Sequence, residues 1–294
     1  MGENLGNTLD QVRKRIDTLI EEKPSHKEIL EFFKEVMTEQ YRMRTSTNPV
    51  SVRIDGEKTQ ALIEGNPLLD KKELCLDVPS ATKLFKKLCG LLSFNQDNSG
   101  DTKRIKQALL NKDINLEELF MHVGIENDEY ISALSKRLKV KDDLLSFLAG
   151  NSVKPIFEAY ASQLKGYVDQ EMWWRGYCPV CGSMPFIAQF REEGERFLTC
   201  SLCGFEWRFM RLKCPFCENE DHKRLRYFYT NSEGTAYRVD VCEKCKRYIK
   251  TLDTREMAGE VILIIEDIGT LYLDVLAQRE GYLSGGKTHG VVIN

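Results

Sequence analysis

Cysteine is the residue type in this chain whose number and spacing indicate a chemistry. Eight of the ten cysteines fall between positions 178 and 245, as four Cys-x-x-Cys pairs. The pairs are Cys178 and Cys181, Cys200 and Cys203, Cys214 and Cys217, and Cys242 and Cys245. Two intervening residues let one tight turn aim both sulfurs at one point, and two such turns complete a tetrahedral thiolate site for Zn²⁺ or iron. The sequence therefore predicts two metal ions, zinc or iron, one in each four-cysteine site.

The four pairs can form two sites in three ways: by neighbours, crossed as in RING-type modules, or nested. Grouping by neighbours is favoured, because the intervals between the first two pairs and between the last two pairs both have the pattern of a β-hairpin. The strand-like runs of these hairpins are residues 186–190, 195–198, 225–230 and 236–241. We therefore expect one site at Cys178, Cys181, Cys200 and Cys203, and the other at Cys214, Cys217, Cys242 and Cys245.

A third strand-like run follows the second pair of each set, at residues 206–210 and 247–250. The repeating unit is thus a duplicated zinc-ribbon or rubredoxin-like module. A module of about 35 residues buries too little apolar surface to fold without an additional cross-link, which favours a structural role for the metal ion. Redox iron is the alternative. Four thiolates leave no open position for water, so we expect no hydrolytic metal catalysis. The four histidines of the chain do not form a catalytic set with a serine and an aspartate, so we expect no other catalytic centre.

The residues around the cysteine pairs carry a specific resemblance. It rests on residues 174–185, 198–203, Glu206-Trp207, Arg211, 214–217, 242–250, Lys154-Pro155, 266–274 and Gly281-Tyr282. In these runs, which span about residues 144–283, the chain resembles the formate dehydrogenase accessory protein family, FdhE. The resemblance implies a cytoplasmic maturation factor, not an enzyme. It also implies that the factor binds the catalytic subunit of a molybdenum- or tungsten-dependent formate dehydrogenase and holds metal at these cysteines.

Composition limits the other possibilities. The 294 residues are 42% hydrophobic, enough for a sizeable core, yet no apolar run reaches about 18 residues. Residues 1–20 are polar and amphipathic, without a signal-peptide core, so we expect a cytoplasmic protein that does not insert into membranes. Cysteines in metal-type pairs fit a reducing compartment. Cys75 and Cys89 stand apart, and we predict that both are free, buried thiols.

Charge argues against nucleic acid as a partner. The net charge is −3, although residues 175–250 hold 14 Lys and Arg against 10 Asp and Glu. A divalent ion with four thiolates carries −2, so two such sites cancel the local surplus. A zinc-ribbon nucleic-acid-binding protein, which needs an unbalanced basic face, is therefore a weaker alternative than an assembly protein or a rubredoxin-like electron-transfer protein.

The first 170 residues carry the apolar periodicity of helices. Helices are expected at residues 8–22, from a capping box at Ser25–Glu28 to about 44, from a Ser80 cap to 92, and at 102–112, 115–123, 127–137, 141–149 and 152–171. Residues 45–72 contain several Gly and Pro without a sustained period and are predicted to form a long loop. Near the other end, residues 261–265 have the pattern of a buried strand or helix start, before a helix to about 278 and a flexible end.

The predicted fold is α+β: a helical N-terminal domain, two tandem zinc-ribbon or rubredoxin-like modules and a C-terminal helix. The domain boundaries are placed at 1–170, 171–212, 213–254 and 255–294, with the last segment packing back on the helical domain. Trp173, Trp174 and Trp207 are expected to pack between the helical and metal regions. Five exposed side chains beside the turns are expected to face a partner: Arg175, Glu206, Arg211, Lys246 and Tyr248.

Overall fold

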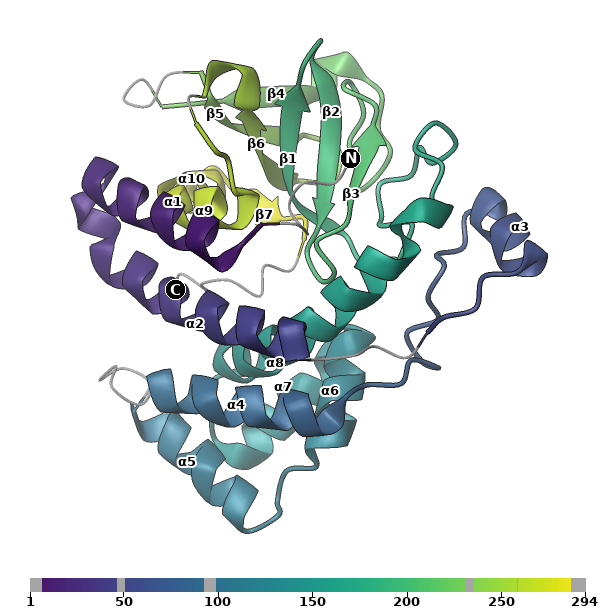
Figure 1. The fold of residues 1–294 in the computed structure, drawn as a ribbon. Helices are drawn as coiled ribbons and strands as arrows, with labels where there is room; N and C mark the ends of the chain where they lie inside the picture. The colour runs from purple at the N-terminus through teal and green to yellow at the C-terminus, as the bar shows by residue number, and fades with distance from the viewer. Residues whose placement is uncertain (1–6, 47–50, 93–98, 231–234, 258, 287–294) are drawn as a thin grey trace.

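The computed structural model describes residues 7–46, 51–92, 99–230, 235–257 and 259–286. Helices of the N-terminal part lie on one side of the molecule and a β-sheet on the other (Figure 1). These helices are α1 Leu9–Glu22, α2 Lys27–Ser46, α3 Gly56–Glu64, α4 Val78–Leu92, α5 Ser99–Leu110, α6 Leu116–Gly124, α7 Asp128–Leu138 and α8 Asp142–Leu164. Within the described ranges, no helix has both the length and the apolar character needed to cross a membrane.

Two predicted helix starts are wrong in detail. Ser25 does not act as a helix cap, because it lies within a 3₁₀ turn, Pro24–His26, that runs directly into α2. Proline is favoured in a first turn because the backbone N–H groups there have no hydrogen-bond partner within the helix, so the absence of an N–H costs no hydrogen bond. At α4 the carboxylate of Asp77, rather than the Ser80 hydroxyl, accepts a hydrogen bond at the helix start, from the Ser80 N–H at 3.1 Å.

The segment 45–72, predicted to be a loop, contains the helix α3. The Asp55 carboxylate caps its start by accepting a hydrogen bond from the Lys58 N–H at 2.9 Å. Gly65 ends it with φ of 101°, a left-handed conformation that favours glycine. The Asp55 cap and the Gly65 stop are both visible in the sequence. The apolar pattern between them is short, however, and the surrounding Gly and Pro residues are a stronger signal for a loop.

The two helices predicted at 141–149 and 152–171 are one continuous helix, α8, ending at Leu164. Pro155 lies inside it and removes the N–H that would bond the carbonyl of Asn151. Gln40 on α2 supplies a replacement, because its side-chain Nε2 donates to that carbonyl at 3.0 Å. A tertiary hydrogen bond thus lets the helix pass through a proline that predicts a break.

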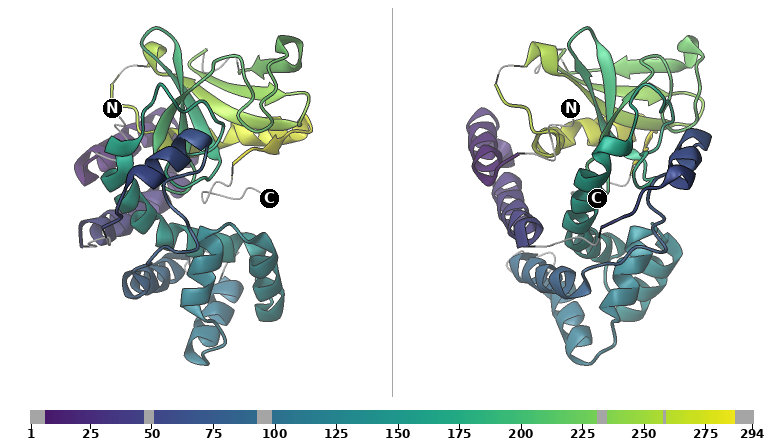
Figure 2. Two further views of the ribbon diagram at one scale, coloured as in Figure 1. Left: turned by 90° about the vertical axis from the view of Figure 1, so that its right-hand side faces the viewer. Right: turned by 45° about the vertical axis from the view of Figure 1, so that its right-hand side comes forward.

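The six main strands form one sheet in which both modules take part (Figures 1 and 2). They are β1 Pro185–Arg191, β2 Glu195–Cys200, β3 Glu206–Phe209, β4 Leu225–Phe228, β5 Tyr237–Cys242 and β6 Arg247–Asp253, in the spatial order β3-β2-β1-β6-β5-β4. Each module is an antiparallel three-stranded meander, as the two hairpins and third runs predict. The modules join where β1 runs parallel to β6, from the pair Ile187–Lys250 to Phe190–Asp253.

The C-terminal segment divides into two helices and a strand. Helix α9, Leu263–Gly269, lies against α1 and α2, whereas α10, Leu271–Arg279, lies against β5 and β6 (Figure 1). The predicted single helix is interrupted at Thr270, whose hydroxyl donates to the carbonyl of Glu266 at 2.7 Å. The end predicted to be flexible instead forms β7, Leu283–Ser284, parallel to β6, while residues 287–294 lie outside the described part.

One buried apolar cluster connects the helices with the first module. It extends from Ile16 and Phe85 in the helices to Leu198 and Trp207 in the sheet. Trp173 and Trp207 are buried, as expected, while Trp174 is half-buried. The helical and metal regions therefore pack as one body, and the residue boundaries between the domains stay a prediction.

Candidate metal centres

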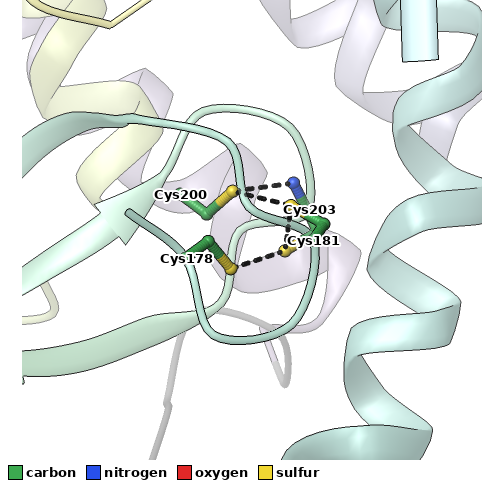
Figure 3. A group of neighbouring side chains, drawn as sticks. All are labelled: Cys178, Cys181, Cys200 and Cys203. Carbon is green, nitrogen blue, oxygen red and sulfur yellow. Dashed lines mark hydrogen bonds between the residues drawn. The ribbon is translucent and has the colours of Figure 1, made fainter. Parts of the chain in front are cut away.

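The first centre lies between the start of β1 and the turn after β2. Its four sulfurs converge, with 3.5 Å between the sulfurs of Cys178 and Cys203, 3.4 Å between those of Cys181 and Cys200, and 3.5 Å between those of Cys181 and Cys203 (Figure 3). All four residues are at least 98% buried. The centre is therefore closed to solvent on every side.

The second centre repeats this arrangement between the turn that precedes β4 and the turn that joins β5 to β6. The sulfurs of Cys214 and Cys245 are 3.8 Å apart, and those of Cys217 and Cys242 are 3.6 Å apart. Cys217 and Cys245 are only half-buried, so this centre lies nearer the surface than the first. In both centres the structure brings together neighbouring pairs, all four sulfurs lying within 4.8 Å of one another.

These distances fit a tetrahedral metal site. A Zn–S bond of about 2.3 Å places the sulfurs of a tetrahedron about 3.8 Å apart, whereas a disulfide requires about 2.05 Å. The observed separations of 3.4 to 3.8 Å match the first value and exclude the second. Each centre could therefore hold one metal ion; that these eight cysteines bind it remains a proposal, and zinc and iron accept the same ligands.

The four Cys-x-x-Cys turns share one backbone form. The residue after the second cysteine is left-handed in every turn, and its N–H donates to the carbonyl of the first cysteine. The φ values are 76° at Gly182, 65° at Gly204, 55° at Glu218 and 56° at Lys246, with N···O distances of 2.9, 3.2, 3.0 and 2.8 Å respectively. Only the first module places glycine, which accepts this conformation without strain, at these positions.

The pKa shifts of the cysteines indicate that the four thiols of a centre do not all ionise in the absence of a cation. Burial raises the pKa of Cys178 and of Cys203 well above that of an ordinary thiol. Burial opposes ionisation of Cys181 too, but hydrogen bonds from the other thiols and the nearby Lys71 ammonium lower its pKa. In the second centre, burial raises the pKa of Cys245 to about 11. Four thiolates so close together need a divalent ion to be stable.

Lys71 is a site residue that the sequence did not reveal. Its ammonium donates to the Ser183 hydroxyl at 2.7 Å and lies 3.3 Å from a carboxylate oxygen of Glu126. Burial alone would lower the pKa of Lys71, yet the charges of Cys181 and Glu126 raise it. The segment that carries it is fixed to the first turn, since the N–H of Leu68 donates to the Pro179 carbonyl at 2.9 Å. No local signal in residues 66–72 predicts this role.

Two of the five side chains expected on a partner-facing surface are buried instead. Glu206 is 3% exposed and its carboxylate lies 2.6 Å from the Arg191 guanidinium. Tyr248 is also 3% exposed, and its hydroxyl donates to Asp274 at 2.8 Å. Arg211 and Lys246 are exposed and Arg175 is half-buried. Strand alternation turns Glu206 and Tyr248 inward, where ion pairs and hydrogen bonds satisfy them.

A buried network of charges joins the sheet to the C-terminal helices. Lys250 is 2% exposed, and its ammonium lies 2.7 Å from Asp267 and 2.6 Å from Asp274. Beside it, the buried carboxylate of Glu266 lies 2.5 Å from Nε of Arg15 on α1 and accepts a hydrogen bond from the Tyr237 hydroxyl at 2.8 Å. The run 266–274, which carries part of the family resemblance, thus supplies the acids of this network.

The cysteines outside the pairs behave differently from each other. Cys89 is buried as predicted, and burial raises the pKa of its thiol to about 12. Cys75 is exposed, so the prediction of burial is wrong for it; it lies in the irregular segment between α3 and α4. His222 is exposed in a short 3₁₀ turn, and the metal-type groups of the described residues do not include it.

The fold and site together define an α+β protein in which a helical domain supports two fused modules with the geometry of four-thiolate metal sites. The family models for the FdhE central domain and the FdhE C-terminal domain match residues 177–211 and 212–289. The FdhE homolog of Aquifex aeolicus is 29% identical over 92% of this chain and 90% of its own length. These matches support the resemblance of the chain to the FdhE family.

Two further relatives define how far this similarity extends. Protein FdhE of Escherichia coli O127:H6 is 37% identical, but over only 37% of this chain and 35% of the E. coli protein. The crystal structure of the FdhE protein from Pseudomonas aeruginosa covers 96% of this chain with a TM-score of 0.65, at 21% identity. The sequence match to the E. coli protein is thus partial, whereas the fold is shared along nearly the whole chain.

Proposed function

We propose that this chain is a cytoplasmic accessory protein, not an enzyme, that binds the catalytic subunit of formate dehydrogenase and assists its maturation. The proposal comes from the role that the FdhE family implies. The observation that carries it is the pair of four-sulfur centres, in which the protein itself supplies every ligand of a tetrahedral ion. Such a centre has no position left for a substrate, so it suits a rigid binding surface.

The metal ions would be held by Cys178, Cys181, Cys200 and Cys203 in the first centre, and by Cys214, Cys217, Cys242 and Cys245 in the second. When bound, each ion supplies cross-linking of two turns, which fixes the strands that the turns connect. Because both modules share one sheet, the loops of one module are positioned relative to those of the other. A preorganised surface loses less conformational freedom when a partner binds.

Rubredoxin-like electron transfer is a second candidate, favoured by one feature of the second centre. Cys217 and Cys245 are half-buried there, so an iron ion between them would lie close to the surface and to a redox partner. The colour of protein purified without oxygen separates the two functions. Colourless protein with two zinc ions supports the structural role, whereas a red protein that bleaches on reduction supports electron transfer.

The accessory role is tested by replacing one cysteine pair in cells that lack the chromosomal copy. We expect Cys214→Ser with Cys217→Ser to release the second ion, to abolish recovery of the dehydrogenase catalytic subunit in a pull-down, and to lower cellular formate dehydrogenase activity. The control is Cys75→Ser, which removes an exposed thiol outside both centres. Normal activity and normal pull-down with the ion-free variant would contradict the proposal, as would formate turnover by the purified chain.

A further inference from the structure

The two faces of the sheet are covered differently. Lys250 on β6 points toward α9 and α10, because its ammonium contacts Asp267 and Asp274 there. Its neighbours Ile249 and Thr251 therefore point to the opposite face. Residues that pair across neighbouring strands lie on the same face of the sheet. Arg238 and Asp240 on β5 pair with Thr251 and Ile249, and Tyr227 on β4 pairs with Asp240, so all three lie on this face. We refer to this side as the open face because α9 and α10 do not cover it, although Ile249 and Thr251 themselves are buried.

A groove on the open face collects positive charge. It lies where the two modules meet, beside the linker residues 211–216, and Cys214 and Cys242 of the second centre form part of its wall. Six Arg and Lys side chains line it with a single carboxylate, Asp240, which pairs with Arg196 and Arg238. Lys213 pairs with Glu218 and Glu220, outside the lining. Among the described residues, no carboxylate is ion-paired with Arg211 or Arg247. Arg211 and Arg247 are thus the cations of the groove that are most available to a carboxylate from a partner.

Aromatic rings hold the arginines of this groove in place. The guanidinium of Arg238 lies 4.5 Å from the ring centroid of Phe190 and 4.7 Å from that of Tyr227. The guanidinium of Arg211 lies 4.9 Å from the centroid of Phe190. Stacking leaves the edges of a guanidinium available for paired hydrogen bonds to a carboxylate. Below them Arg196 is 3% exposed, and its Nε has no hydrogen-bond partner.

The outer edge of β4 adds backbone hydrogen-bonding groups next to these arginines. β4 is the last strand of the sheet and pairs with β5 alone among the described strands. Tyr227 and Tyr229 are 58% and 44% exposed, and their rings stack with centroids 6.5 Å apart. An extended peptide can add to such an edge as a further strand, with alternate side chains turned toward the groove.

We propose that an acidic, extended segment of the dehydrogenase catalytic subunit enters the groove from the edge of β4 and places carboxylates on Arg211 and Arg247, because Arg238 already pairs with Asp240. This inference rests on the proposed function for the identity of the partner. A peptide suits the groove better than a nucleic acid does, because the adjacent second centre carries −2 when it holds a divalent ion. That charge repels any polyanion, and it opposes a phosphate backbone, with one charge per nucleotide, more strongly than a peptide with two or three carboxylates.

The chemistry of the groove is tested by fluorescence anisotropy with the full, metal-loaded chain. The probes are a labelled peptide of alternating Glu and Val, its Lys and Val counterpart, and a single-stranded oligouridine. The groove variant is Arg211→Glu with Arg247→Glu. The control is Lys83→Glu with Lys86→Glu, which changes the charge equally at exposed positions of α4. Metal content and circular dichroism confirm that both variants are folded.

We expect the acidic peptide alone to bind the wild-type chain and the control, with affinity that falls as salt rises. The groove variant should bind it at least ten-fold more weakly. Equal binding to all three proteins, or to none, would overturn the inference. So would tighter binding of the oligouridine that is lost in the groove variant, since the groove would then be a nucleic-acid site.

A pull-down of the dehydrogenase catalytic subunit separates this inference from the proposed function. We expect the wild-type chain and the control to recover the subunit and the groove variant to lose it. Recovery by all three would overturn the groove as the docking site while leaving the accessory role intact. Failure of the wild-type chain to recover the subunit would instead overturn the accessory role, and with it the identity of the partner.

Discussion

At the scale of single residues, the four turns that carry the cysteines differ at one position. A left-handed residue follows each second cysteine, and it is glycine in the first module but Glu218 and Lys246 in the second. The cysteine spacing, with the hairpin patterns between the pairs, is sufficient to predict which four sulfurs converge in each centre. It does not predict Lys71, which reaches the first centre from more than 100 positions away and has no local pattern of its own.

The left-handed turn makes Glu218→Gly a stabilising change. A residue with a Cβ loses about 1 kcal/mol or more in this conformation, and glycine relieves that strain. Glu220→Gly is the matched control, because Glu220 also faces Lys213 but is not left-handed. In chemical denaturation we expect Glu218→Gly to exceed Glu220→Gly in free energy of unfolding by about 1 kcal/mol. A variant less stable than the control would contradict the assigned turn.

Lys71→Met should weaken metal binding in the first centre. Its ammonium lies beside the sulfur group, and removing it leaves the charge of a four-thiolate site uncompensated in a buried position. We expect metal to pass from the first centre to a chelator about ten-fold faster, a typical effect of removing a residue that interacts with the metal ligands rather than with the metal itself. The neighbouring exposed Lys72→Met is the control. Equal release rates in both variants would show that Lys71 has only a packing role.

At the scale of secondary-structure elements, local patterns predict the strands and most helices but fail where a tertiary contact decides. The hairpins follow from alternating runs around polar turns, and the structure reproduces them. Helix α3 depends on a cap at Asp55 and a stop at Gly65, which a search for long apolar periods overlooks. Helix α8 continues through Pro155 because Gln40, more than 100 residues away, donates a hydrogen bond to the Asn151 carbonyl, to which the proline cannot donate.

The contact between α2 and α8 is measurable as a double-mutant cycle. Gln40→Leu removes the donor to the Asn151 carbonyl and should lower the free energy of unfolding by about 1–3 kcal/mol. Pro155→Ala restores a backbone N–H that can bond the same carbonyl, so Gln40→Leu should have a smaller effect in that background. Denaturation of the four proteins should give a coupling of about 1 kcal/mol. Additive effects would show that Gln40 does not compensate for the proline.

At the scale of the whole molecule, the fusion of the modules is the feature that local patterns could not predict. The parallel pairing of β1 with β6 joins residues about 60 positions apart, and nothing in either strand specifies its partner. The same limit applies to the buried charges, because nothing in the local runs around Lys250, Asp267 and Asp274 indicates that these residues pair with one another. The burial of these three charged side chains is possible because the fold brings the distant segments that carry them together as ion pairs.

Lys250→Met tests how strongly this network ties the sheet to the C-terminal helices. The change leaves two carboxylates beside an apolar side chain, and removal of one partner from a buried ion pair costs about 3–5 kcal/mol. Lys244→Met, at an exposed position of the same module, should have little effect. Thermal unfolding should show a large loss for Lys250→Met alone. Similar stabilities in the two variants would mean that water or a rearrangement satisfies the acids.

We propose that eight cysteines hold two metal ions, around which the partner-facing region is organised. Native mass spectrometry of the chain purified without oxygen tests it most directly. We expect a mass that corresponds to two bound ions per chain, reduced to one ion by either Cys178→Ser with Cys181→Ser or Cys214→Ser with Cys217→Ser. A wild-type chain that carries no ion, or whose cysteines are paired as disulfides, would contradict the account.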